Sequence, residues 1–292
     1  MAADQDDKLF AEFGLHYRRP PELFRSVVDV SSASLNGYTH VLRRAWKSFD
    51  NLRGVLSVRG RPTVYLQEQA GDGRISLKDQ RRFWSNGVAP ILVRVTPKEV
   101  QIYSGLRPPA LDGEDVDGNK RLVDVFGRTA KALEVREFLR SVEAGTAYDH
   151  YPEHFDPTQA VDQRLVQNLR AARELMSKGS DAPDLPGIHR LLGRFLFTCY
   201  LEARGALSPK DFGWLGAGSR ATFKGLLSLP EPSLVREALR RLFRRLGRYF
   251  RGDLFDDDLA RDLTALRDDD TITLRNLITC DDRAAGFEFP AE

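Results

Sequence analysis

Residues 190–205, read as RLLGRFLFTCYLEARG, constrain the fold more than any other stretch of the chain. Apolar side chains recur there at three- and four-residue spacing, which is the spacing of one face of an α-helix. The expected apolar face consists of Leu191, Leu192, Phe195, Leu196, Cys199 and Tyr200. Phe197 and Leu201 add apolar surface beside it, and Gly205 is a typical residue to end a helix. We therefore predict a long helix that other elements cover on most of its sides.

The second half of the chain, from about residue 155, is predicted to consist of helices packed around this one. Asp156 followed by Pro157 is a typical helix start, and the helix predicted from there continues to about Met176. The other predicted helices cover residues 184–204, 220–227, 233–250, 258–266 and 271–278, with a short turn at 208–212.

The first half has a different pattern. After a loose arm with a short helix at residues 8–13, we expect the order helix, strand, strand, helix, strand, strand. These elements are predicted at residues 38–49, 53–58, 63–69, 76–84, 89–95 and 99–103. Each pair of strands is joined by a short turn, so two hairpins are predicted.

A loop without secondary structure is expected at residues 105–120, and a helix at 129–142 leads out of the first half. The predicted fold class is α+β. A small mixed α/β domain would cover residues 1–145, and an all-helical domain would cover residues 146–292.

Composition excludes some classes of protein and leaves others open. The net charge of the 292 residues is only +2, so an argument for nucleic-acid binding must rest on where the charges lie. Arginine far outnumbers lysine among the 44 basic residues, which favours bidentate contacts to phosphate or carboxylate. Cys199 is expected in the core, and no Cys or His cluster indicates a zinc site. No apolar run could span a membrane, and the acidic N-terminus lacks a secretory signal, so a cytoplasmic protein without a membrane partner is expected.

The element order predicted for the first half is that of the restriction-nuclease-like core. That core carries an acid on one strand of a hairpin and an E-x-K motif on the next, which together hold a divalent metal beside a phosphodiester. The matching positions here are Gln67 and Gln69, and the strand at 53–58 has no carboxylate. Glutamine supplies no negative charge to a metal. We therefore expect a scaffold without catalytic residues or a metal.

Two alternatives stay open for this chain. One is an active metal-dependent DNA nuclease that uses Glu68, although this carboxylate at the strand edge is better explained by exposure to solvent. The other is a protein-interaction module without affinity for DNA. Whether the chain is an enzyme is therefore left open.

The segment at residues 233–250 has two distinct faces. Its apolar stripe consists of Val235, Leu239, Leu242, Phe243, Leu246 and Phe250. The predicted DNA-binding residues lie on the rest of the helix and are Arg236, Arg240, Arg241, Arg244, Arg245 and Arg248. With Arg251 they make seven arginines within sixteen residues, enough to neutralise several phosphates. The alternative is a solvated face paired with the acidic run at residues 256–258.

Three further motifs favour structural roles. The sequence LGAGS at 215–219 is expected to be a loop and helix start, because no strand precedes it as in a dinucleotide-binding loop. Asp149, His150 and His154 are interpreted as polar linker residues. Trp84 and Trp214 are expected to anchor the core rather than to serve as platforms on which bases stack.

Several phrases together resemble a known family. They are GVLSVRGRPTVYLQE at 54–68, FWSNGVAPILVRVTPKEVQIYSG at 83–105, RLLGRFLFTCYLEARGAL at 190–207 and YFRGDLF at 249–255. These resemble the N-terminal region of large bacterial N6-adenine DNA methyltransferases and single-chain restriction-modification enzymes. The resemblance covers about residues 36–290.

The resemblance implies a role in DNA modification or restriction, in defence against phage. The methyltransferase domain of that family has a glycine-rich cofactor loop and an NPPY-type motif, and neither is present here. S-adenosylmethionine is thus implied for the full-length family and no cofactor for this chain. The implied partners are DNA, contacted through its backbone, and a methyltransferase domain or subunit. The expected function is a non-catalytic region that positions DNA or the catalytic domain.

Overall fold

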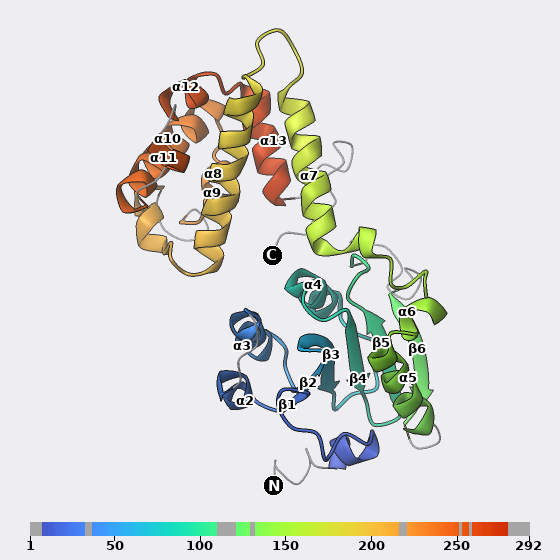
Figure 1. Cartoon of the computed structure of the whole chain (residues 1–292). Helices are drawn as coiled ribbons and strands as arrows, with labels where there is room; N and C mark the ends of the chain where they lie inside the picture. Colours follow the sequence, from blue (N-terminus) through green and yellow to red (C-terminus); the bar gives the residue numbers. More distant parts are fainter. Residues whose placement is uncertain are drawn as a thin grey trace. The chain divides into compact units, whose positions relative to one another are not determined.

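The computed structural model describes residues 8–32, 37–109, 121–128, 132–215, 221–250, 253–256 and 259–279 (Figure 1). The chain divides into two compact units with the boundary between Gln163 and Arg164, and we call them unit 1 and unit 2. The fold class is α+β, with a six-stranded mixed sheet and many helices. No helix among the described residues is both long and apolar enough to cross a membrane.

The sheet of unit 1 has its strands side by side in chain order. They are β1 (Leu23–Phe24), β2 (Leu52–Val58), β3 (Arg61–Glu68), β4 (Ile91–Val95), β5 (Glu99–Ser104) and β6 (Leu122–Gly127). All neighbouring strands are antiparallel except β3 and β4, which are parallel. Helix α4 (Leu77–Asn86) makes the crossover that a parallel pair requires. Both predicted hairpins, β2–β3 and β4–β5, are confirmed.

The β2–β3 turn is tighter than the sequence indicated. Arg59 and Gly60 both have positive φ, at 52° and 76°. Two consecutive left-handed residues give a two-residue turn whose twist matches that of the flanking strands. Strand β3 therefore begins at Arg61, two residues before its predicted start.

Helices cover both faces of this sheet (Figure 1). They are α2 (Val27–Ser32), α3 (Thr39–Ser48), α4, α5 (Ala132–Ala144), α6 (Ala147–His150) and a turn of helix at 8–12. Val64 and Leu66 of β3 pack with α5 and the residues near the N-terminus. Tyr65 packs with α3 and α4 on the opposite face. Side chains of β3 thus alternate between the two faces of the sheet, and both faces are buried.

Some elements of unit 1 differ from the expectation. The sequence did not predict β1, β6 or α2, because two to six residues are too few to show a clear period. Asp156 does not cap a long helix. It caps the 3₁₀ turn η1 (Pro157–Gln159), and the next helix starts only at Val161. The predicted domain boundary followed residue 145, whereas Ala147 and Phe155 are buried in the core of unit 1.

The described elements from the unit boundary onward are helices. They are α7 (Val161–Met176), α8 (Leu185–Ala203), η2 (Pro209–Leu215), α9 (Phe223–Leu227), α10 (Pro232–Tyr249), α11 (Asp253–Asp256), α12 (Leu259–Thr264) and α13 (Asp268–Thr279). Asp184 caps α8 by accepting a hydrogen bond from the Gly187 N–H at 2.8 Å. The predicted helices at 184–204 and 233–250 are therefore confirmed to within two residues.

The buried face of α8 is rotated from the predicted one. Its buried residues are Gly187, Ile188, Leu191, Leu192, Arg194, Phe195, Thr198 and Leu201. Tyr200 is 51% exposed, so the prediction that it faces the core is wrong. Cys199 is only partly buried, at the edge of the core. Burial raises the pKa of the Cys199 thiol to about 12. The rotation places Arg194 inside the unit, where it is fully buried.

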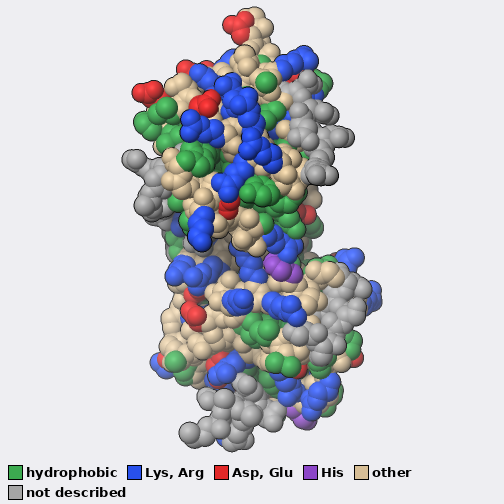
Figure 2. All heavy atoms as spheres, turned by 90° about the vertical axis from the view of Figure 1, so that its left-hand side faces the viewer, with side chains coloured by type: hydrophobic (Ala, Val, Ile, Leu, Met, Phe, Trp, Pro, Cys, Tyr) green, Lys and Arg blue, Asp and Glu red, His purple; other side chains and the backbone are tan. Residues whose placement is uncertain are grey.

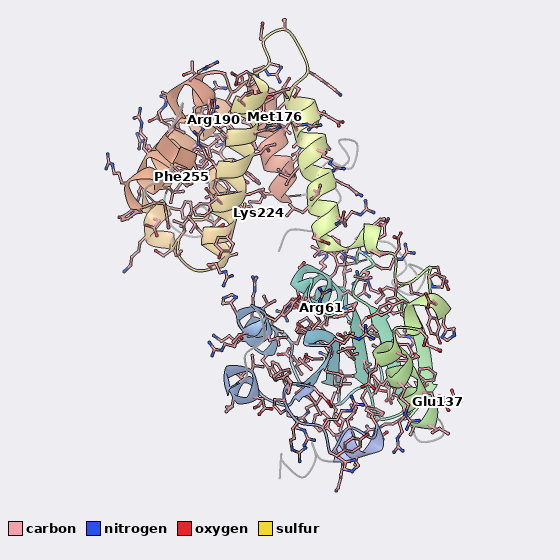
Figure 3. The ribbon with its side chains drawn as sticks, in the orientation of Figure 1. Arg61, Glu137, Met176, Arg190, Lys224 and Phe255 are labelled. Atoms are coloured by element: carbon pink, nitrogen blue, oxygen red, sulfur yellow. The ribbon has the colours of Figure 1, made fainter. Side chains whose placement is uncertain are left out.

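A buried charge cluster explains how the core accepts Arg194. Arg194 Nη1 lies 2.6 Å from one oxygen of Asp262, and Arg190 Nη2 lies 2.6 Å from the other. Arg194 Nε also donates to the Leu254 carbonyl at 2.5 Å. These contacts connect α8 to α11 and α12, and Figure 3 labels Arg190 on α8 and Phe255 on α11. A buried guanidinium is tolerated because its charge and its donors are satisfied.

Candidate nucleic-acid interface

Helix α10 is strongly amphipathic. The predicted apolar stripe is buried from Val235 to Leu246, together with Ala238. Phe250 is 38% exposed and lies at the C-terminal cap of the helix, so its assignment to the stripe is wrong. The buried stripe fixes the rotation of α10, and the six predicted arginines lie outside it.

Two rows of side chains run along this outer surface of α10. The first row consists of Arg240, Arg244 and Arg248, and the second consists of Arg241, Arg245 and Tyr249. Residues four apart are neighbours on a helix surface, so each row is continuous. Figure 2 shows Lys and Arg side chains gathered on the face of unit 2 that it displays, with hydrophobic side chains beside them.

Acidic residues already pair with four of the six arginines. Arg236 forms an ion pair with Asp268. Arg240 and Arg241 lie 3.2 and 3.4 Å from the Glu237 carboxylate. Arg245 lies 2.7 Å from Asp211. Part of the α10 surface is therefore paired, through acidic residues other than the run at 256–258 that the sequence offered.

Arg244 and Arg248 differ from the other four. Both are exposed, and within the described part of the chain no carboxylate forms an ion pair with them. The acidic side chains at 256–258, which the sequence offered as partners, lie outside the described residues. Among the described residues, these two adjacent positive charges on one helix therefore have no acidic partner.

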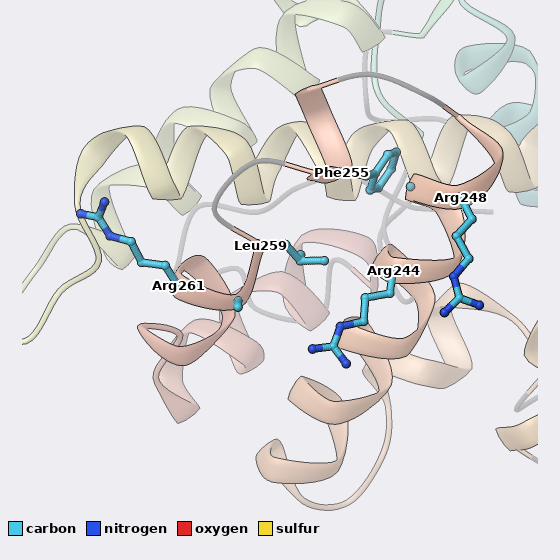
Figure 4. A pocket seen from close by; sticks show the side chains of 7 residues that line it. Arg244, Arg248, Phe255, Leu259 and Arg261 are labelled. Atoms are coloured by element: carbon cyan, nitrogen blue, oxygen red, sulfur yellow. The ribbon is translucent and has the colours of Figure 1, made fainter.

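Arg244 and Arg248 separate two hollows in the surface of unit 2. One, of about 620 Å³, lies between the two rows and is lined by Arg241, Arg244, Arg245, Arg248 and Tyr249. The other, of about 570 Å³, has Phe255 and Leu259 in its wall and Arg261 at its far side. Figure 4 shows Arg261 pointing away from the α10 arginines. Arg261 pairs with Asp184 at 2.8 Å, so the cationic side of both hollows belongs to α10.

Two exposed aromatic rings accompany the second row. The Arg241 guanidinium lies 5.6 Å from the centroid of Trp214, and that of Arg245 lies 5.9 Å from the centroid of Tyr249. Trp214 is 39% exposed and Tyr249 is 68% exposed. The prediction that Trp214 anchors the core is therefore wrong. It is confirmed for Trp84, which is fully buried and donates from Nε1 to the Gln159 carbonyl at 3.3 Å.

Gln67 and Glu68, which the sequence analysis compared with a nuclease motif, both have partners in the protein. Gln67 is buried, and its Nε2 donates to the Asp50 carbonyl at 3.0 Å. Glu68 is not a solvated carboxylate, because its side chain is 17% exposed and lies 3.0 Å from Arg53. The described residues contain no group of three His, Cys, Asp or Glu side chains that could hold a metal.

The remaining predicted motifs have no ligand-binding geometry in the described residues. Residues 216–219 of LGAGS lie outside them, and the following helix is capped by Thr222. His154 Nε2 lies 3.2 Å from Glu153, and the His154 carbonyl accepts a hydrogen bond from Ser104 at 2.7 Å. The segment that contains Asp149 and both histidines belongs to unit 1.

No protein-family model, curated protein or solved structure matches this chain. The geometry of α10 is therefore the main basis for a functional proposal.

Proposed function

We propose that this chain binds the phosphate backbone of DNA through α10 and acts as a non-cutting scaffold that presents DNA to a catalytic domain or subunit. The observation that carries the proposal is the pair of exposed arginines, Arg244 and Arg248, without an acidic partner among the described residues. The second row adds Arg241, whose side chain is 62% exposed.

Arginine suits this role for chemical reasons. Its planar guanidinium donates several hydrogen bonds in a fixed fork that matches two phosphate oxygens. Binding to phosphates releases condensed counterions, so each contact adds to the salt dependence of the affinity. Arg244 and Arg248 lie one helical turn apart, about 6 Å along the axis, so both can reach neighbouring phosphates.

The scaffold part of the proposal is supported by unit 1. The antiparallel strands β1, β2 and β3, the crossover helix α4 and the parallel strand β4 follow one another in an order that supports a relation to the restriction-nuclease-like core. Gln67 and Gln69 occupy the positions where that core needs charged groups, and Glu68 is held by Arg53. These features favour a domain that does not cut DNA.

The partner in the proposal comes from the resemblance to N6-adenine DNA methyltransferases. In that reading the chain serves DNA modification or restriction against phage. S-adenosylmethionine would bind to the methyltransferase domain or subunit, and this chain would supply contacts to the DNA backbone.

Fluorescence anisotropy with a labelled DNA duplex at several salt concentrations tests the DNA contact. The full chain should bind with an affinity that falls as salt rises. In the double variant Arg244→Gln/Arg248→Gln, the slope of log affinity against log salt should be smaller by about 2, since two phosphate contacts are lost.

Arg170→Gln/Arg173→Gln is the matched control. It removes the same charge from two arginines on α7 of the same unit, one exposed and one with a side chain that is 42% exposed, and should leave the salt slope unchanged. Equal loss in both double variants would mean that only total charge matters, and unchanged binding in the α10 variant would remove α10 from the interface.

A further inference from the structure

This inference rests on the proposed function and concerns which form of DNA unit 2 binds. The second row of α10 combines cations with exposed aromatic rings. We propose that the first row contacts phosphates while Trp214 and Tyr249 stack on unpaired bases, so that unit 2 binds single-stranded DNA more tightly than duplex DNA.

The exposure of the rings is the first argument. Trp214 and Tyr249 are among the large hydrophobic side chains that the fold leaves in contact with water. In a duplex the bases are already stacked and paired, and their faces cannot reach a protein surface. An unpaired base offers its whole face, and sequence-tolerant binding of single strands combines aromatic stacking with a cationic groove.

The second argument is that the protein holds Trp214 against α10. The Trp214 indole N–H donates to the Asp211 carbonyl at 3.1 Å, and the Asp211 carboxylate pairs with Arg245 at 2.7 Å. The same carboxylate accepts the Ser208 N–H at 2.8 Å. Hydrogen bonds from Ser208 and the charge of Arg245 keep the pKa of Asp211 low, so these contacts persist at neutral pH. The η2 turn is therefore attached to the second row, and less entropy is lost when a base stacks.

The third argument is the arrangement of charges and rings. Trp214 lies beside Arg241 at one end of the second row, and Tyr249 forms the other end, about 12 Å further along the helix. The hollow of about 620 Å³ separates this row from Arg244 and Arg248. A strand that follows the hollow can place phosphates on the first row and bases on the second.

The test compares two affinities of the full chain. One is for a labelled twenty-nucleotide oligothymidine, which cannot form a duplex with itself, and the other is for a duplex of the same length. The wild-type protein should bind the single strand more tightly. Trp214→Ala/Tyr249→Ala should lose about tenfold of that affinity for each ring and keep its affinity for the duplex. Trp214→Phe/Tyr249→Phe retains both rings and should bind oligothymidine nearly as the wild type does.

Tryptophan fluorescence gives a second readout. Oligothymidine should quench part of the emission of the wild-type protein, and Trp214→Phe should remove that part. Unfolding of each variant in urea checks that a lost affinity does not come from a lost fold. Two outcomes would overturn the single-strand proposal and leave duplex binding intact. In one, the alanine variant binds oligothymidine as tightly as the wild-type protein does. In the other, the wild-type protein binds the duplex and not oligothymidine. Absence of binding to both forms would instead remove the proposed function itself.

Discussion

The same side chain has opposite roles at two positions of unit 2. Arg194 is fully buried, and its charge is neutralised by Asp262, so it contributes to the fold. Arg244 is exposed, and no carboxylate among the described residues forms an ion pair with it. The two roles are connected, because the Asp262 cluster holds α12 and α11, which form the far wall of the hollow beside Arg244.

Asp262→Asn should destabilise unit 2 by about 3–5 kcal/mol, because it leaves Arg194 as an uncompensated buried charge. Chemical unfolding in urea, followed by circular dichroism, measures this change. Asp268→Asn is the control, since Asp268 is 65% exposed and its pair with Arg236 should contribute less than about 1 kcal/mol. Equal effects of both substitutions would show that the cluster does not stabilise the core.

The pH dependence of stability in Asp262→Asn provides a further check on the cluster of Arg190, Arg194 and Asp262. Burial by itself would raise the pKa of Asp262, but hydrogen bonds from Arg190 and Arg194 and their charges outweigh it and lower the pKa below its ordinary 3.8. A depressed carboxyl pKa contributes stability above the unfolded-state value and loses it as pH falls through the folded-state value. The stability difference between the wild type and Asp262→Asn should therefore be full at neutral pH and shrink below about pH 4.

At the scale of elements, the sheet of unit 1 depends on a close approach after strand β5. An added Cβ at Gly105 would lie 2.6 Å from the Ala89 carbonyl oxygen and 2.9 Å from the Phe83 ring. The Gly105 N–H donates to the Pro90 carbonyl at 2.7 Å. The end of β5 thus packs closely against the segment that leads into β4. Only glycine fits at position 105 without a shift of the backbone.

Gly105→Ala should destabilise the protein by about 1–3 kcal/mol, because the added methyl meets backbone and cannot be accommodated by a rotamer change. The midpoint of thermal unfolding reports it. Gly127 in β6 has no atom within 4 Å of an added Cβ, so Gly127→Ala should change stability by less than about 0.5 kcal/mol. If Gly105→Ala unfolds at the wild-type midpoint, the close packing at this position is wrong.

At the scale of the whole molecule, charge is nearly balanced, with 44 basic and 42 acidic residues. Long-range attraction to DNA is therefore weak, and binding must depend on local surfaces such as α10. Metal binding also depends on a local group of side chains. In the described residues Glu68 forms an ion pair with Arg53, and no acidic cluster surrounds it.

Incubation of the full chain with supercoiled plasmid and Mg²⁺ or Mn²⁺ should yield neither nicked nor linear product. A hydrolytic site needs carboxylates to hold the metal beside the phosphodiester, and Gln67 cannot replace them. Agarose gel electrophoresis is the measurement. Cleavage that disappears in Glu68→Gln would establish the nuclease alternative and contradict the scaffold.

The sequence by itself determined the elements with long or regular patterns. Apolar residues at three- and four-residue spacing indicated α8 and α10, and β-branched runs separated by turn residues indicated the two hairpins. It also led to the expectation that Gln67 and Gln69 replace the charged groups of a nuclease-like motif. These properties depend on neighbours in the chain, which is why a linear pattern reveals them.

The tertiary structure alone decided which sides of those elements meet other parts of the chain. Nothing near Arg194 in the sequence indicates what neutralises its charge, because its partner Asp262 lies 68 residues further on. From the sequence we expected Trp214 in the core, but η2 places it at the surface beside Arg241. Likewise, acidic residues from η2 and α13 pair with Arg245 and Arg236, while Arg244 and Arg248 have no such partner among the described residues. Burial and charge pairing depend on which distant segments come within a few ångströms, and that is a property of the folded chain.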